Sequence, residues 1–128
     1  MPINQKGTTF DRVQQVLFET LGVEEDEVKG DATIVGDLGA ESIDFLDLVF
    51  RLEKEFNIKI PRGDLFPENV LSDPQSVSGG KITEAGLTEL KRRMPWLDDR
   101  RLAKDQNVQN FLTVDGICAY IETKIAPS

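Results

Sequence analysis

The first half of the chain holds two stretches in which apolar residues recur every three or four positions, the spacing of one helix face. The first stretch runs from a cap at Thr8 or Thr9 to a stop at Gly22, with its apolar positions at Phe10, Val13, Val16, Leu17 and Leu21. The second begins near Ser42 and ends before Pro61. We expect its inward stripe at Ile43, Leu46, Val49, Leu52 and Phe56, flanked by Phe45 and Leu48.

The second half predicts shorter helices separated by turns. Residues Ser76–Gly80 are expected to form a flexible hinge, and Thr83 can cap a helix that Pro95 ends. A short helical turn starts at Asp98 or Asp99. Thr113 caps a last helix whose inward positions are Val114, Ile117, Cys118, Tyr120 and Ile121. Because only the short run Ile58–Ile60 alternates with the period of a strand, the predicted fold class is all-α.

Composition narrows the classes of function. The net charge of -8 disfavours binding to nucleic acid or to anionic membranes and favours protein partners with basic patches. The chain has no histidine and one cysteine, so it lacks a Ser–His–acid triad, an internal disulfide and a multi-cysteine zinc site. Neither a signal peptide nor a long apolar run is found, and we expect a cytoplasmic monomer without stable membrane insertion.

One motif carries chemistry. The second predicted helix is entered by Asp37-Leu38-Gly39-Ala40-Glu41-Ser42-Ile43-Asp44. A serine at a helix start has an ordinary role as a cap. The wider pattern, however, resembles the signature of acyl carrier proteins, in which the modified serine opens helix two. Residues 9–61 are similar to the first two helices and long loop of that family, and residues 112–121 to its final helix.

The resemblance implies a 4′-phosphopantetheine arm on Ser42, added by a phosphopantetheinyl transferase. A phosphodiester suits a helix N-terminus, where unpaired N–H groups favour negative charge. The arm ends in a thiol that holds an acyl chain as a thioester, so the carrier needs no catalytic residue and no metal. Fatty-acid synthase and elongation enzymes and acyltransferases would be the partners. By position, the docking face of the family falls on Glu41, Asp44, Asp47, Phe50 and Glu53.

The chain departs from the family between its second and last helices. The carrier core covers about residues 8–61 and 111–125 of a single domain, and residues 62–110 form an unusually long insertion. In one interpretation the insertion enlarges an acyl pocket lined by Leu46, Val49, Leu87, Leu90, Met94 and Trp96. In the other it only covers an exposed core edge or packs on a dimer mate. The residues of helix two also resemble carriers of very-long-chain fatty acids for lipid A.

Two other functions stay open at this point. The chain could be an unmodified helical interaction module that keeps a carrier-like fold, or a carrier of a polyketide or peptide pathway. A hydrolase using Ser42 lacks an obvious base. Cys118 is expected to be a small core residue rather than a functional thiol.

Overall fold

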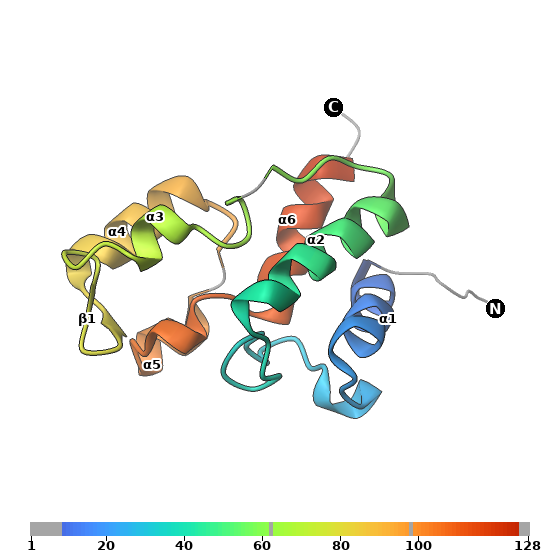
Figure 1. The fold of residues 1–128 in the computed structure, drawn as a ribbon, viewed down its shortest axis with the longest axis horizontal. Helices are drawn as coiled ribbons and strands as arrows, with labels where there is room; N and C mark the ends of the chain where they lie inside the picture. The colour runs from blue at the N-terminus through green and yellow to red at the C-terminus, as the bar shows by residue number, and fades with distance from the viewer. Residues whose placement is uncertain (1–8, 62, 98, 126–128) are drawn as a thin grey trace.

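The computed structural model describes residues 9–61, 63–97 and 99–125, and the chain is mainly helical within these ranges (Figure 1). Three longer helices, α1 (Thr9–Leu21), α2 (Ser42–Phe56) and α6 (Val114–Ile125), form a bundle in which α1 packs against both others. The predicted helical class is thus confirmed. The alternative caps Thr8 and Asp98 lie outside the described residues.

The ends of the helices follow the chemistry of their termini. Gly22 follows α1 with a φ of 70°, the left-handed conformation that glycine adopts readily. Thr113 precedes α6, and its hydroxyl accepts a hydrogen bond from the Gly116 N–H at 3.0 Å. The predicted boundaries of both helices are confirmed.

The buried face of α2 differs from the predicted stripe. Phe45, Leu48, Leu52 and Phe56 point into the core, whereas Ile43 and Leu46 are 70% and 59% exposed. The cause is geometric: a step of three residues turns an α-helix by about 300°, so a 3-3-3 stripe drifts by about 60° at each step. Ile43 therefore lies on the side of α2 opposite Leu52. The steps of three and four from Phe45 to Phe56 stay on one face.

The segment that we expect to be an insertion, called the insertion below, contains small elements of its own. The long loop before α2 holds one short helix, η1 (Glu25–Glu27). The insertion follows α2 and forms α3 (Glu68–Leu71), β1 (Val77–Ser78), β2 (Lys81–Ile82), α4 (Glu84–Arg93), α5 (Arg100–Lys104) and η2 (Val108–Asn110). The expected cap of α4 is confirmed, since Thr83 accepts from the Gly86 N–H at 3.1 Å. Helix α4 ends before Pro95, as predicted.

The segment Ser76–Gly80 is not a flexible hinge. Strands β1 and β2 pair antiparallel with Val77 opposite Ile82, and the turn between them is made by two glycines with positive φ, Gly79 and Gly80. Ser76 is buried against α4. Two consecutive glycines suit a tight hairpin turn as well as a linker, and the sequence pattern alone did not distinguish them.

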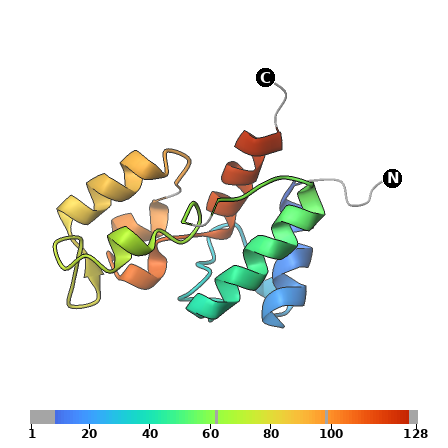
Figure 2. The same ribbon diagram turned by 45° about the horizontal axis from the view of Figure 1, so that its top comes forward.

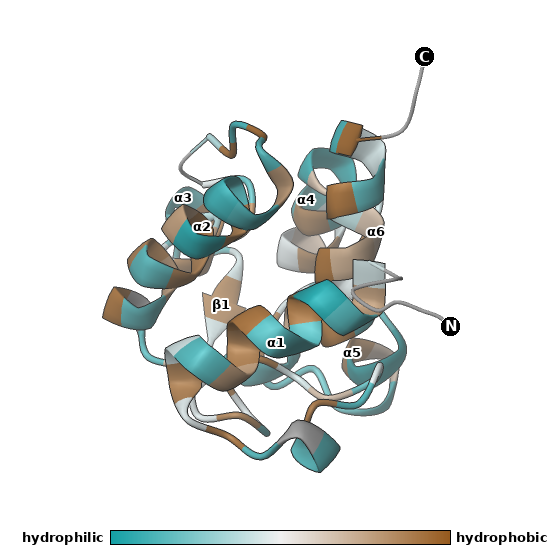
Figure 3. Cartoon of the chain, turned by 90° about the vertical axis from the view of Figure 1, so that its right-hand side faces the viewer, coloured by the Kyte–Doolittle hydropathy of each residue, from teal (hydrophilic) through white to brown (hydrophobic). Residues whose placement is uncertain are grey.

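The insertion lies beside the bundle, next to α2 and α6 (Figures 1 and 2). Its buried apolar residues belong to the same cluster as those of the three longer helices, and they are Leu65, Val70, Ile82, Leu90, Met94 and Leu102. Phe66 lies with its ring centroid 4.7 Å from that of Phe45 on α2. The Trp96 and Tyr120 rings pack at 5.0 Å. Hydrophobic and hydrophilic stretches alternate along α1 and α2, as expected of helices with one buried face (Figure 3). No helix within the described ranges has the length and hydropathy that a membrane crossing requires.

Candidate functional site

Ser42 is the first residue of α2 rather than its cap. Glu41 occupies the cap position with an extended backbone, and the Asp44 carboxylate accepts a hydrogen bond from the Glu41 N–H at 2.8 Å. The ordinary role of a serine at this place, that of the cap, thus belongs to Glu41. The Ser42 side chain lies outside the described part of the structure, but its neighbours Glu41 and Ile43 are both exposed. The start of α2 thus lies at the surface.

The loop before Ser42 is held together by hydrogen bonds within its own backbone. The amides of Leu38 and Ala40 donate to the carbonyls of Thr33 and Ile34, each at 3.0 Å. Gly39 takes a φ of 76°, which an L side chain rarely adopts. Five side chains of residues 31–41 are buried, those of Ala32, Thr33, Ile34, Leu38 and Ala40. A closely hydrogen-bonded loop therefore delivers the chain to the start of α2.

The segment before α6 holds the same loop from the other side. Thr33 and Thr113 form an antiparallel bridge, in which the Ile34 N–H donates to the Leu112 carbonyl at 2.9 Å. The Val114 N–H donates to the Ala32 carbonyl at 3.0 Å. The loop is thus tied to the C-terminal part of the bundle.

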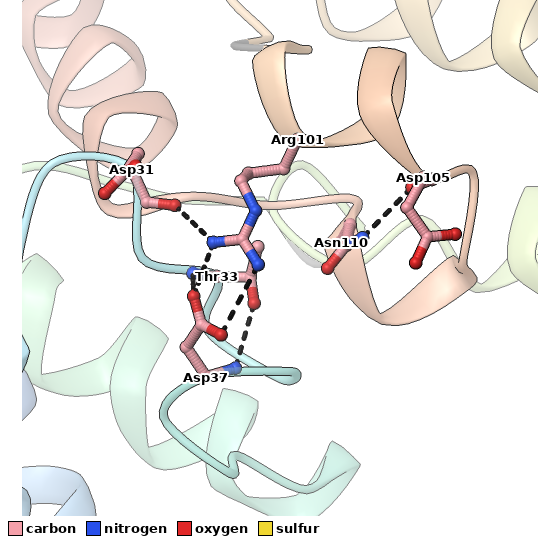
Figure 4. Close-up of polar contacts among 6 residues, drawn as sticks. All are labelled: Asp31, Thr33, Asp37, Arg101, Asp105 and Asn110. Carbon is pink, nitrogen blue, oxygen red and sulfur yellow. Dashed lines mark hydrogen bonds and ion pairs between the residues drawn. The ribbon is translucent and has the colours of Figure 1, made fainter.

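Arg101 of the inserted helix α5 also reaches this loop (Figure 4). Its Nη1 donates to the Asp31 carbonyl at 3.0 Å and to the Asp37 carboxylate at 2.6 Å. The Thr33 N–H donates to that same carboxylate at 3.0 Å. The hydrogen bond from Arg101, followed by that from the Thr33 backbone, lowers the pKa of the Asp37 carboxyl below its ordinary value.

The outer face of α2 carries exposed apolar side chains beside Ser42. They are Ile43, Leu46 and Phe50, and Phe50 is 54% exposed. Lys54 lies over the Phe50 ring, with its Nζ 4.7 Å from the centroid. Ile43 and Leu46 were expected inside the protein and now belong to this surface. Exposed apolar residues gathered on one helix face are typical of a contact surface.

The acids of the predicted docking face are partly engaged within the chain. Asp47 is exposed and forms an ion pair with Arg51 at 3.2 Å. Glu53 is half-buried, and its carboxylate accepts from the Ile60 N–H at 2.8 Å. Asp44 bonds the cap, as described above. The face is therefore mixed: apolar and acidic groups lie together along α2.

An apolar pocket of about 290 Å³ opens beside this face. Its lining residues are Ile43, Phe45, Leu46, Val49, Ile60, Gly63, Phe66 and Glu68. A second, more polar hollow of about 470 Å³ adjoins it, lined by Gly63, Asp64, Phe66, Pro67, Glu68, Asn69, Arg93 and Met94. Both hollows share Gly63, Phe66 and Glu68, so they meet at the start of the insertion.

The predicted pocket residues separate in the structure. Leu46 and Val49 line the apolar pocket, and Met94 lines the adjoining hollow. Leu87, Leu90 and Trp96 are among the lining residues of neither. The Trp96 ring packs on Tyr120 of α6 instead. The structure thus brings only part of the predicted set together.

Three residues of the site were not found by sequence reasoning. Phe66 joins the two hollows, Ile60 lines the first, and Arg101 binds the loop before Ser42. Phe66 follows a turn that contains Gly63 and carries no periodic signal. Ile60 stands in the alternating run that follows α2. Arg101 is one of several basic residues in a short helix, and its partner lies 64 positions earlier in the chain. Only the three-dimensional structure reveals that contact.

Cys118 shows no sign of reactivity. Its side chain is half-buried, and burial raises the pKa of the Cys118 thiol to about 12. The thiol therefore stays protonated near neutral pH. This agrees with the expectation of a packing residue.

The start of α2 fits a phosphopantetheine group by its chemistry. A 15-residue helix presents N–H groups and the positive end of its dipole to the phosphate of a modified Ser42. The neighbouring residues Glu41 and Ile43 are exposed, and an apolar pocket begins at Ile43. The residues present are thus those that a surface-attached, acyl-bearing arm requires.

Comparison with known proteins agrees with this geometry. The sequence pattern of the family described as "Phosphopantetheine attachment site" matches residues 11–73, which include the whole of α2. The chain belongs to the acyl carrier protein family, whose members carry 4′-phosphopantetheine and are not enzymes.

Within that family, the chain is similar to the acyl carrier protein AcpXL of Rhizobium meliloti (strain 1021). The two are 35% identical over 96 residues, which cover 75% of this chain and 93% of the relative.

Proposed function

We propose that Ser42 carries the 4′-phosphopantetheine arm and that the arm holds long acyl chains as thioesters for enzymes of fatty-acid or lipid synthesis. The observation that carries this proposal is the position of Ser42 as the first residue of α2, one residue from the mouth of an apolar pocket. The thioester forms on the thiol of the arm, so the protein supplies position and shelter. A cytoplasmic setting and a monomeric state stay predictions.

The two joined hollows support long or very long chains as cargo. The chain would enter between Ile43 and Leu46, pass Phe66, and continue toward Met94. The apolar side chains of this path bury an alkyl chain without losing hydrogen bonds, and the polar groups of the second hollow lie beside them. The insertion supplies Phe66 and Glu68, so it extends the space available beyond α2. A second copy of the chain is not needed for this lining.

The outer face of α2 is the proposed docking surface. Asp47, Phe50 and Glu41 point outward near Ser42, together with the exposed Ile43 and Leu46. Basic groups on a transferase, synthase, elongation enzyme or acyltransferase would be steered by the acids. The apolar side chains would supply the anchor once contact is made. Asp44 and Glu53 contribute charge while they also hold backbone N–H groups.

The attachment is tested by incubating the pure protein with coenzyme A and a promiscuous phosphopantetheinyl transferase. Intact mass is expected to rise by one arm in the wild type and in the matched control Ser78→Ala, and to stay constant in Ser42→Ala. An equal increase in Ser42→Ala would assign the arm to another residue. No increase in any protein would show an unmodified interaction module.

The cargo is tested by loading arms with acyl chains of increasing length. Short chains are expected to shift the backbone amide signals of Leu46 and Val49, and longer chains those of Phe66 and Met94. Phe18, which is exposed on α1 and lines neither hollow, serves as the internal control. If the amide signals of Phe66 and Met94 do not change with the length of the acyl chain, the proposed path of the chain toward Met94 is refuted.

A further inference from the structure

We propose that Arg101 is a positioning residue for the attachment of phosphopantetheine to Ser42. Its guanidinium, carried by the insertion, holds the loop of residues 31–41 in the form that presents the serine to the transferase. The proposal rests on the proposed function of Ser42. It gives the insertion a role in modification that is separate from any role in acyl binding.

The contact fixes two ends of one turn with one side chain. Arg101 Nη1 donates to the Asp31 carbonyl at 3.0 Å and to Asp37 Oδ2 at 2.6 Å, and its Nη2 lies 3.5 Å from Asp37 Oδ1. Figure 4 shows the guanidinium between these two partners. A planar fork of donors makes such paired contacts, which the point charge of lysine cannot reproduce.

Hydrogen bonds transmit this hold toward Ser42. Besides its bond with Arg101, Asp37 accepts from the Thr33 N–H at 3.0 Å and donates its own N–H to the Thr33 hydroxyl at 2.9 Å. Thr33 in turn accepts from the Leu38 N–H. The Ala40 N–H closes the loop on Ile34, two residues before α2 starts. Release of Asp37 therefore loosens the residues that set the direction of the first turn of α2.

The exposure of the pair predicts a local rather than a global effect. The side chains of Arg101 and Asp37 are 29% and 40% exposed. Ion pairs at such sites contribute little to overall stability because water screens them. Loss of Arg101 should therefore leave the melting temperature nearly unchanged and act on the order of the loop. This separates positioning from general support of the fold.

The step that depends on loop position is the transfer itself. The serine oxygen forms a bond to the phosphorus that bears pantetheine in coenzyme A. The bond from that phosphorus to the oxygen bridging the two phosphates breaks, and adenosine 3′,5′-bisphosphate leaves with the bridging oxygen and the electron pair. The serine proton passes to a base of the transferase or to water. An in-line attack of this kind depends on the orientation of the acceptor oxygen.

The experiment compares Arg101→Ala with the matched control Arg100→Ala. Arg100 precedes Arg101 in α5 and pairs with Asp115 of α6 at 2.6 Å, so each variant loses a positive charge and the 2.6 Å ion pair described here. We expect kcat/KM for modification of Ser42 to fall about tenfold in Arg101→Ala only, because a smaller fraction of molecules holds the competent loop. The exchange rate of the Ala40 amide should rise by about the same factor.

Two further variants keep the test decisive. Arg101→Lys keeps the charge but not the planar guanidinium, and it should recover only part of the rate of Ser42 modification. If Arg101→Ala fails to fold, Asp37→Asn tests the same contact from the other side. Equal rates in Arg101→Ala and Arg100→Ala, or unchanged exchange at Ala40, would overturn the positioning role alone. An unmodified wild type would overturn the proposed function, and this proposal with it.

Discussion

Gly86 in the first turn of α4 offers a sharp test of how tightly the insertion is packed. A Cβ atom at Gly86 would lie 2.2 Å from the Ser76 carbonyl oxygen and 2.9 Å from the Ser76 carbonyl carbon. That oxygen also accepts from the Thr83 N–H at 2.8 Å, so it is held in place. Gly86→Ala gains about 1 kcal/mol of helix propensity. It should lose about 1–3 kcal/mol to overpacking and about 1 kcal/mol from the disturbed hydrogen bond.

Gly116 in α6 is the matched control. A Cβ there would meet the Thr113 hydroxyl at 3.4 Å, a Leu112 methyl at 3.5 Å and the Trp96 ring at 3.7 Å, which are close but tolerable contacts. We expect Gly116→Ala to be neutral or to stabilise by up to about 1 kcal/mol. Gly86→Ala should be destabilised by roughly 1–3 kcal/mol net.

Urea unfolding followed by circular dichroism measures both variants, and the midpoints are comparable if the slopes agree. A Gly86→Ala protein as stable as Gly116→Ala would refute the close approach of α4 to the hairpin. It would also indicate that the segment around Ser76 can move away from α4.

Three further predictions concern the site and its supports. Tyr120→Phe removes the hydroxyl that donates to Asp64 at 2.5 Å. We expect the free energy of unfolding, measured in urea, to fall by about 1.5–3 kcal/mol, and an unchanged midpoint would contradict this. The lowered pKa of Asp37 means that its ion pair contributes fully above about pH 4 and is lost as the pH falls through the folded-state value. Amide exchange at Ala40, corrected for intrinsic rates, should then speed up only in acid, and protection that is constant down to pH 2 would contradict this. Phe50→Ala should raise the KM of the transferase for this carrier about fivefold, without changing how that KM depends on salt concentration. Steady-state kinetics at two salt concentrations measure both, and a changed salt dependence of KM would contradict the apolar role of Phe50.

The sequence allowed the carrier core to be predicted because its signals are local. Capping by Thr113 and the stop at Gly22 depend on a few neighbouring residues, and both were confirmed. Position in the motif also placed Ser42 within one residue of its site at the helix start. Chemistry that depends on a short stretch of chain is readable from that stretch.

The remainder depends on contacts between distant segments. Apolar residues surround much of α2, and packing against distant segments, such as the rings of Phe66 and Phe111, decides that Phe45 is buried while Leu46 is exposed. The site likewise needs Phe66 and Arg101, which packing of the insertion brings to the carrier core. The spacing of residues along the chain does not predict such long-range contacts.

The bridge between Thr33 and Thr113 has a consequence for biosynthesis. The loop that leads to Ser42 is completed by residues some eighty positions later in the chain, in the segment before α6. A ribosome adding about 5–20 residues per second exposes the serine motif several seconds before those residues exist. A nascent chain therefore displays the motif without the loop that shapes it. Premature termination before this segment would leave the serine motif without the backbone hydrogen bonds that Leu112 and Val114 make with Ile34 and Ala32.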